Sequence, residues 1–296
     1  MGGYYYSEVL SSSKAGDLVS GRNPKLVALD LLPKTSWWKL FIDKKYHKEA
    51  TPCLLFDRQK SKGFHAVMMR VFKSELYCCL GERLNFRLYE RMYLSVSTDV
   101  EGIQNRGRSG TNAVNSKGVK VGATNFPTEI VPSEAAIQEL YDEGIGCWDI
   151  VGGRPCTLPA AKACLMHTGL SGWRIYINYT TEEAPGLANG LFDRYYDDLA
   201  LAGLDNQHQV RAIARLVRAL HTYHFFQDAN GRLNTMVVLN KLLLENGFAP
   251  TIVCNPAIFG GALTLDRLVK EIFKGMRPVL QEMEAHLKLA HLDLAL

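Results

Sequence analysis

Five residues whose side chains or backbone can serve phosphate chemistry lie between positions 224 and 232: His224, Asp228, Asn230, Gly231 and Arg232. An imidazole can take a proton from a hydroxyl, and a carboxylate is a hard oxygen ligand suited to Mg²⁺ that bridges phosphates. Glycine allows close approach of an anion to the backbone, and arginine adds a permanent forked charge. The set indicates phosphoryl or nucleotidyl transfer. The alternative is an ordinary turn, because Asp-Ala-Asn-Gly is also a common turn sequence.

Two segments with apolar residues at helical spacing flank this loop. The first carries an apolar stripe formed by Val210, Ile213, Ala214, Val217 and Leu220. The second is predicted to begin near Leu233 and to end at Asn246-Gly247, a good C-terminal cap, with Pro250 beyond. The loop therefore leads into a helix N-terminus, where free backbone N–H groups and the helix dipole attract anions. His221 lies one helical turn before His224, and we expect it to cap or stack there.

The loop resembles the signature of the Fic family, H-P-F-x-[D/E]-G-N-G-R-x-x-R, at six positions: His224, Phe226, Asp228, Asn230, Gly231 and Arg232. The resemblance implies a mainly α, Fic-type helical bundle that moves AMP from ATP to a Ser, Thr or Tyr hydroxyl of a target protein. It makes His224 the base, Asp228 the Mg²⁺ ligand and Phe226 a core anchor. The α-phosphate is then held at Ala229, Asn230 and Gly231, and Arg232 binds the outer phosphates.

Three positions depart from the family pattern within the signature loop, residues 224–235. Phe225 replaces proline and relaxes the turn, and Ala229 replaces the first glycine with a methyl that narrows or reorients the phosphate site. Thr235 replaces the last arginine, which seats the terminal phosphates in the family. Two alternatives to an AMP transferase therefore stay open. One is the same fold with another nucleotide donor, such as CDP-choline, and the other is a degenerate fold that binds a nucleotide or partner without turnover.

A second part of the resemblance lies at residues 172–181. The segment Gly-Trp-Arg-Ile-Tyr-Ile that begins at Gly172 alternates small or polar with bulky residues, which predicts a short strand. It resembles the family's G-x-x-R stretch, which leads into a β-hairpin flap that pins the target segment by strand addition. The resemblance implies that Arg174, Ile175, Tyr176 and Ile177 bind the target protein.

A third segment, residues 97–102, resembles the family's inhibitory motif, [S/T]-x-x-x-E-[G/N], at Ser97, Glu101 and Gly102. In the family this motif lies on a helix beside the nucleotide site, and its glutamate blocks the productive pose of the γ-phosphate. The alternative is an ordinary helix end with Gly102 as its cap. Glu101 needs a positive partner, since Thr235 stands where the family has the usual arginine.

The remaining pattern predicts a mainly helical chain with one small β element. Residues 96–296 form the Fic-like catalytic domain, and residues 1–95 form either a recognition lobe or extra helices, with additional α/β elements. Helices are predicted at 84–97, after Ser133, from Pro185 to Gly203, and from Gly260-Gly261 to the C-terminus, the last broken near Pro278. The segments 53–56 and 66–72 fit either a strand or a helix. Residues 106–125 carry four glycines among polar residues and predict an exposed loop.

Composition limits the function classes. The chain has 296 residues, 47% hydrophobic, with a formal net charge of +4, which is typical of a globular protein and gives little indication of a nucleic-acid partner. Arg211, Arg215 and Arg218 recur on one predicted helix face, a spacing typical of a solvated surface. The seven cysteines form no C-x-x-C pair and are expected to be reduced thiols. No membrane-spanning segment is predicted, so we expect a cytoplasmic protein or an effector delivered into a host cytosol.

Overall fold

The computed structural model describes residues 24–59, 61–100, 120–125, 133–145, 163–167, 173–179, 182–226 and 228–293. For residues 24–26, 120–125, 141, 163–167, 173–178 and 290–293 it describes the backbone alone. The described chain is mainly helical, as the sequence predicts. Three short strands form its β structure.

The helical elements of the first hundred residues are α2 (Pro24–Leu31), η2 (Lys34–Leu40), η3 (Lys44–Tyr46), α3 (Pro52–Gln59), α4 (Phe64–Arg70), η4 (Val71–Glu75), α5 (Leu76–Cys79) and α6 (Phe86–Ser97). Later elements are β1 (Lys120–Asn125), α7 (Glu134–Asp142), β2 (Ala163–His167), β3 (Trp173–Tyr179), α8 (Ala184–Ala202), α9 (Asn206–Tyr223), α10 (Asn230–Arg232), η6 (Leu233–Val238), α11 (Leu239–Glu245), η7 (Pro256–Gly260) and α12 (Leu265–Asp293).

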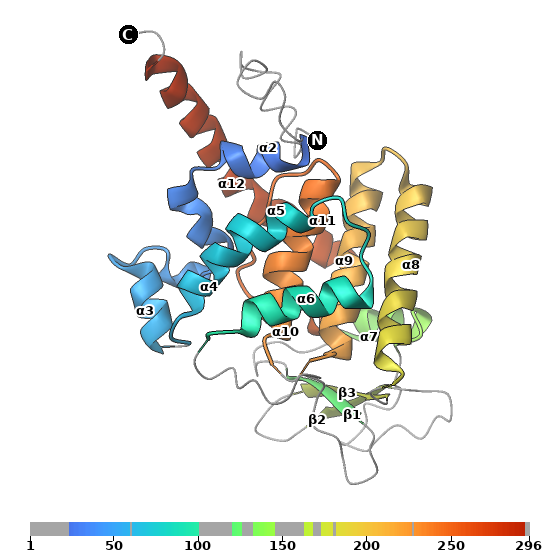
Figure 1. The fold of residues 1–296 in the computed structure, drawn as a ribbon. Coiled ribbons are helices and arrows are strands. Elements are labelled where there is room, and N and C mark those ends of the chain that lie inside the picture. Colours follow the sequence, from blue (N-terminus) through green and yellow to red (C-terminus); the bar gives the residue numbers. More distant parts are fainter. Residues whose placement is uncertain are drawn as a thin grey trace.

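Helix α9 is the centre of the bundle. It packs against α8, α11 and α12, and its C-terminal end lies above the small sheet (Figure 1). The apolar stripe that predicted this helix is buried along its whole length, from Val210 to Leu220. Helix α6 crosses the front of the bundle and contacts α8 and η6 (Figure 1). The loop that joins α9 to α10 therefore lies near α6, at the end of α9 that faces the sheet.

Several sequence predictions are confirmed. Helix α6 forms residues 86–97 of the predicted 84–97 segment, and α8 ends at Ala202 with Gly203 as its C-cap. Ser133 accepts the N–H of Ala136 at 3.2 Å at the start of α7. The ambiguous segments 53–56 and 66–72 are helical, because they lie in α3 and in α4 with η4.

Other predictions need correction. Described residues 24–59 and 61–100 contain helices and no strand, so this region is not α/β. Residues 120–125 of the glycine-rich segment form β1, because β3 supplies a full set of backbone partners for them. Helix α12 continues through Pro278. The expected division at residue 95/96 lies inside α6, and residues on both sides of it share one hydrophobic core.

The arginines of α9 are not a solvated face. Arg218 is fully buried and pairs with Glu139 at 2.7 Å and with Glu143 at 2.9 Å, which fastens α7 to α9. Arg215 pairs with Glu143 and with Asp198, and Arg211 pairs with Asp266 of α12. Since carboxylates occupy these guanidinium groups, they hold helices together and do not form a nucleic-acid surface.

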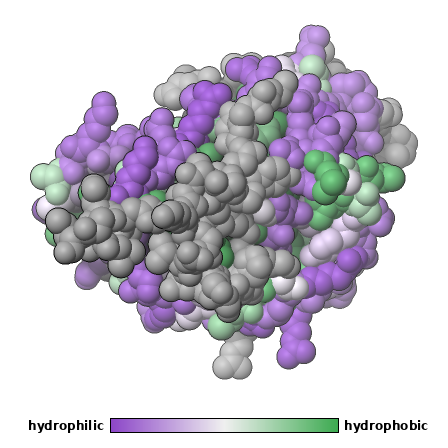
Figure 2. Space-filling view, turned by 90° about the horizontal axis from the view of Figure 1, so that it is seen from above, coloured by the Kyte–Doolittle hydropathy of each residue, from purple (hydrophilic) through white to green (hydrophobic). Residues whose placement is uncertain are grey.

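Among the residues that Figure 2 colours by hydropathy, hydrophilic ones prevail on the face seen from above. Leu201 and Leu204, at the end of α8 and in the turn that follows, are the most exposed large apolar residues, at 87% and 93%. Among the helices that the structure describes, none has both the length and the apolar composition needed to cross a bilayer.

The three strands form an antiparallel sheet in the order β1-β3-β2. Residues 174–179 of β3 pair with β1, from Lys120 opposite Tyr179 to Asn125 opposite Arg174. Residues 173–177 also pair with β2, from Ala163 opposite Ile177 to His167 opposite Trp173. The sheet lies below the C-terminal end of α9, with β1 and β3 both in contact with that helix (Figure 1).

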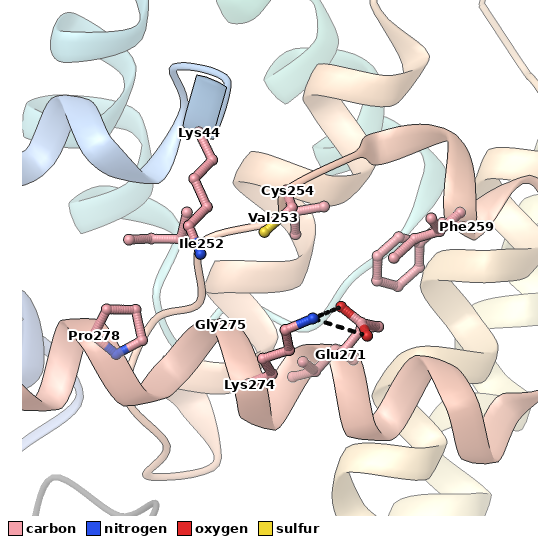
Figure 3. Close-up of a pocket in the computed structure, with 11 residues that line it drawn as sticks. Lys44, Ile252, Val253, Cys254, Phe259, Glu271, Lys274, Gly275 and Pro278 are labelled. Carbon is pink, nitrogen blue, oxygen red and sulfur yellow. Dashed lines mark hydrogen bonds and ion pairs between the residues drawn. The ribbon is translucent and has the colours of Figure 1, made fainter. Parts of the chain in front are cut away.

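Gly275 allows α12 to pack closely against the segment after α11. A Cβ at this position would lie 2.2 Å from Thr251 Oγ1 and 2.5 Å from the carbonyl oxygen of Ile252, and Figure 3 shows Gly275 facing Ile252. Gly190 in α8, in contrast, has no atom within 4 Å of such a Cβ. The close packing therefore requires glycine at position 275, whereas position 190 has room for a larger side chain.

We predict that Gly275→Ala lowers the free energy of unfolding by about 1–3 kcal/mol, because the methyl group forces two backbone segments apart. Gly190→Ala is the matched control, and it raises the same quantity by up to about 1 kcal/mol through helix propensity. Urea denaturation of the two variants beside the wild type measures both effects. A stabilising Gly275→Ala would contradict the close packing.

Candidate functional site

Helix α9 ends because His224 adopts a left-handed conformation, with φ 53° and ψ 53°. Its N–H still donates to the carbonyl of Leu220, and the chain then turns away from the helix axis. Its ring nitrogen Nδ1 lies 3.3 Å from the carbonyl oxygen of His221. A carbonyl only accepts, so Nδ1 carries the proton and Nε2 is the basic nitrogen.

Burial lowers the pKa of His224, while the His221 carbonyl and the charge of Asp228 act in the opposite direction with smaller effect. The imidazole is therefore neutral at neutral pH. A neutral imidazole with a fixed tautomer has the two properties required of a general base.

Two adjacent phenylalanines anchor the loop in the core. Phe226 stacks face to face on Tyr93 of α6, with ring centroids 4.0 Å apart and an interplanar angle of 3°. Phe225 stacks in the same way on Tyr223 at 5.2 Å. Both phenylalanines are buried, at 0% and 1% exposure, which confirms the expectation that Phe226 is a core anchor. Phe225, at the position where the signature has proline, is a second anchor.

Asn230 holds the loop closed. Its side-chain oxygen accepts the N–H of Phe226 at 3.1 Å, and its amide nitrogen donates to the carbonyls of Phe226 at 2.6 Å and Asp228 at 3.3 Å. The residue is 1% exposed. The structure thus gives the Asn230 side chain a different task from the α-phosphate contact that the resemblance implies. It fixes the distance between the two ends of the loop.

Ala229 and Asp228 form the outer rim of the loop. Ala229 has φ 59°, a conformation that costs a non-glycine residue about 1–2 kcal/mol and explains why the family pattern has glycine there. Its N–H donates to Asp228 Oδ1 at 2.6 Å, so this amide is not directed at a phosphate as expected. The Asp228 side chain is exposed beside it.

The residues present fit a Mg²⁺ ion that arrives with a nucleotide. No group of three or more His, Cys, Asp or Glu side chains occurs among the described residues in an arrangement that could hold a metal ion alone. Mg²⁺ bound to nucleotides needs only one or two carboxylates, because phosphate and water oxygens complete its octahedron. The exposed carboxylate of Asp228, next to a helix N-terminus, meets that requirement.

The side chain of Arg232 contacts the segment that leads into α4. Its Nη2 donates to the Ser61 hydroxyl at 2.6 Å, and its guanidinium carbon lies 4.5 Å from the ring centre of Phe64. Burial lowers its pKa, and Asp228 is the largest of the charges that oppose this effect. The charge of Asp228 thus raises the pKa of both His224 and Arg232, so its carboxylate lies in the electrostatic neighbourhood of both groups.

Thr235 is fully buried, and its hydroxyl donates to the carbonyl of Gly231 at 2.6 Å. It lies in η6, a π-helical segment, where the wider turn leaves that carbonyl in need of a donor. The position therefore supplies no cation and directs no polar group outward. Gly231 lies over His221, since a Cβ on Gly231 would be 3.4 Å from His221 Cε1. The His221 and His224 rings meet edge to face at 6.0 Å, which confirms the expected stacking role of His221.

The strand predicted within residues 172–181 is present, but its backbone is not free to pair with a target segment. Arg174, Ile175, Tyr176 and Ile177 lie in β3, which is the central strand and has a backbone partner on each side. A target segment cannot add to a strand whose two edges are already paired. Any strand addition to the described sheet has to use β1 or β2.

Sequence reasoning missed Tyr179, the last residue of β3. Its hydroxyl lies 3.1 Å from the carbonyl oxygen of Tyr223 and 3.2 Å from that of His224, and the side chain is buried. It therefore fixes the sheet to the end of α9 beside His224. A tyrosine that ends an alternating strand is a weak signal, because it does not reveal which backbone the hydroxyl reaches.

The segment that resembles the inhibitory motif leaves the helix directly after its first residue, Ser97. Helix α6 ends at Ser97, Thr98 is extended with ψ 137°, and Asp99 is left-handed with φ 67°. Ser97 is buried, and its hydroxyl donates to the carbonyl of Tyr93, the residue that stacks on Phe226. The segment therefore begins next to the signature loop. Glu101 and Gly102 lie outside the described residues.

A cavity elsewhere is too small for a nucleotide. It lies between α12 and the segment that follows α11, is lined mainly by apolar residues such as Ile252 and Phe259, and has a volume of about 20 Å³ (Figure 3). That volume holds about one water molecule. It does not compete with the loop as a candidate site.

We found no protein-family model that matches the chain and no curated protein with significant similarity to it. The likeness to the Fic signature is carried by the sequence positions quoted above.

The buried histidine beside the site predicts a pH dependence of stability. Burial lowers the pKa of His221 from 6.5 to about 3. Between these values the unfolded chain binds a proton that the folded chain excludes, so folding weakens as pH falls, by about 1.4 kcal/mol per pH unit. From pH 6.5 to pH 5, we expect the wild type to lose roughly 2 kcal/mol of unfolding free energy relative to His221→Gln.

Chemical denaturation at several pH values measures this difference, and comparison with the variant cancels the groups that both proteins share. His208→Gln is the control, because the His208 side chain is 68% exposed. A wild-type to His221→Gln difference that stays constant with pH would show that His221 is not buried as a neutral ring.

Proposed function

We propose that the protein is a nucleotidyltransferase that moves AMP from ATP to a Ser, Thr or Tyr hydroxyl of a target protein. The observation that carries this proposal is the state of His224. Its Nδ1 faces a backbone carbonyl, its ring is neutral, and the exposed carboxylate of Asp228 lies close enough to act on its pKa. A structural turn needs none of these features.

In this proposal Nε2 of His224 accepts the proton of the target hydroxyl as the hydroxyl oxygen attacks the α-phosphorus. The bond from that phosphorus to the bridging oxygen breaks, and pyrophosphate leaves with the electron pair. Asp228 would hold the Mg²⁺ ion, which would neutralise phosphate charge when bound. The backbone at Gly231 can approach the phosphates because no side chain intervenes, and Arg232 supplies the fixed positive charge.

A second donor is supported by one observation. Thr235 is buried and bonded to the carbonyl of Gly231, so the cation that seats a γ-phosphate in the family has no equivalent at this position. A donor with two phosphates, such as CDP-choline, would not need that cation. The alternative product is phosphocholine on the target hydroxyl.

Transfer to protein is the direct test. We expect purified protein with Mg²⁺ and ATP to gain the mass of AMP, on itself or on proteins of a cell extract, in intact mass spectra or with labelled ATP. His224→Ala should slow this transfer by roughly 10²–10⁴-fold, since it removes the general base. His208→Ala, which changes an exposed histidine of the same helix, is the matched control.

Parallel reactions with CDP-choline and UDP-sugars identify the donor. If label is transferred from CDP-choline alone, the protein is a phosphocholine transferase that releases CMP, and the proposal of AMP transfer is wrong. Nucleotide binding without any transfer would leave a binding protein.

Autoinhibition by Glu101 is part of the same proposal. If its carboxylate blocks the phosphate site, Glu101→Gly should raise self-modification with Mg-ATP several-fold. Glu101→Gln is the companion variant, because it keeps the size of the side chain and removes its charge. An unchanged rate in both variants would remove Glu101 from the mechanism.

A further inference from the structure

The side chain of Arg232 is held by a turn that lies 171 residues earlier in the sequence. Ser61 accepts a hydrogen bond from Nη2 at 2.6 Å, and the Phe64 ring lies under the guanidinium at 4.5 Å. Ser61 and Phe64 are 8% and 0% exposed. A planar cation bonded at one nitrogen and stacked on one face has little freedom of rotation.

The turn itself is fixed by its surroundings. The N–H of Phe64 donates to the carbonyl of Ser61 at 3.1 Å, and Gly63 between them has φ 83°. A Cβ on Gly63 would lie 2.8 Å from the carbonyl oxygen of Asp99, just beyond the end of α6. The Phe64 ring packs against Phe56 at 5.1 Å. The seat of Arg232 is therefore joined to α6, the helix that anchors the signature loop through Tyr93.

The other terminal nitrogen, Nη1, is different. It is buried, and it has no hydrogen-bond partner among the described residues. A charged donor that is buried without an acceptor loses its hydration without compensation, so such a group calls for an explanation. An acceptor oxygen that arrives with a ligand explains it, because one nitrogen then fixes the side chain and the other one binds.

We propose that Ser61 and Phe64 are positioning residues that hold Arg232 so that its Nη1 binds an anionic oxygen of the nucleotide. The identity of the ligand rests on the proposed function, whereas the seat itself rests on the contacts described here. The first hundred residues then contribute directly to the nucleotide site. The substitution that tests this is Ser61→Ala, which removes the acceptor of Nη2 and leaves the turn.

Binding of nucleotides to the full chain, measured by calorimetry, separates positioning from folding. The probe is whichever of Mg-ATP and Mg-CDP-choline the wild type binds more tightly, and the matching nucleoside, adenosine or cytidine, lacks the phosphates. We expect Ser61→Ala to weaken nucleotide binding about three- to tenfold and to leave nucleoside binding unchanged. Ser61→Thr keeps the hydroxyl and should restore binding.

Two further variants sharpen the result. Ser74→Ala makes the same change at an exposed serine of the same region and should bind the nucleotide as the wild type does. Arg232→Ala should weaken nucleotide binding at least tenfold, and adding Ser61→Ala to it should have no further effect, because the two residues act through one contact.

The outcomes distinguish the seat from the proposed function. Unchanged nucleotide binding in Ser61→Ala, or an equal loss for nucleotide and nucleoside, overturns the positioning role and leaves the transferase proposal standing. The Ser61 variants can show the expected binding pattern while the wild type transfers no group to protein. That result supports the positioning role and ends the transferase proposal. A wild type that binds neither nucleotide overturns both.

Discussion

The candidate site depends on the parallel stacking of Phe226 on Tyr93. Burying a phenylalanine contributes about 1.5–3 kcal/mol, and two adjacent ones, Phe225 and Phe226, draw the middle of the loop into the core. That energy offsets the left-handed conformations of His224 and Ala229, each of which costs about 1–2 kcal/mol. A loop anchored in this way leaves Asp228 exposed at its rim and His224 largely buried beside it.

The polar groups of the loop divide into those that serve its own shape and those that face outward. Asn230 and Thr235 bond to loop carbonyls, and the amide of Ala229 bonds to Asp228. These contacts make the loop rigid without help from a ligand. A transfer site benefits from such rigidity, because groups that are already oriented need no reorganisation when charge develops.

The sequence predicted the parts that depend on local pattern. The stripe from Val210 to Leu220, the cap at Asn246-Gly247 and the helix at 84–97 follow from helical period and end signals, and all three are present. The grouping of His224, Asp228 and Arg232 around one turn was also readable, since nine consecutive residues contain it.

The features that were not predicted depend on contacts between distant segments. Residues 120–125 contain glycine and small polar residues, and they form a strand only because β3 pairs with them. Tyr179 reaches the carbonyl of His224, 45 positions away, and Ser61 reaches Arg232 across 171 positions. No spacing rule connects such residues, because their proximity is a property of how the helices pack.

The charges of the site also restrict the form in which a phosphate can bind. His224 is neutral, and the charge of Arg232 is opposed by Asp228. Asp43 and Asp57 act on Arg232 as well, so these groups give the site no net positive charge. A bare polyphosphate placed there would meet the repulsion of Asp228 at short range, and Arg232 alone does not outweigh several negative charges. A phosphate that carries its own divalent cation reverses the sign of that contact, because the carboxylate then attracts the ion. For the nucleotide that we propose as the ligand, the presence of Asp228 at the rim therefore favours the metal-bound form over the free anion.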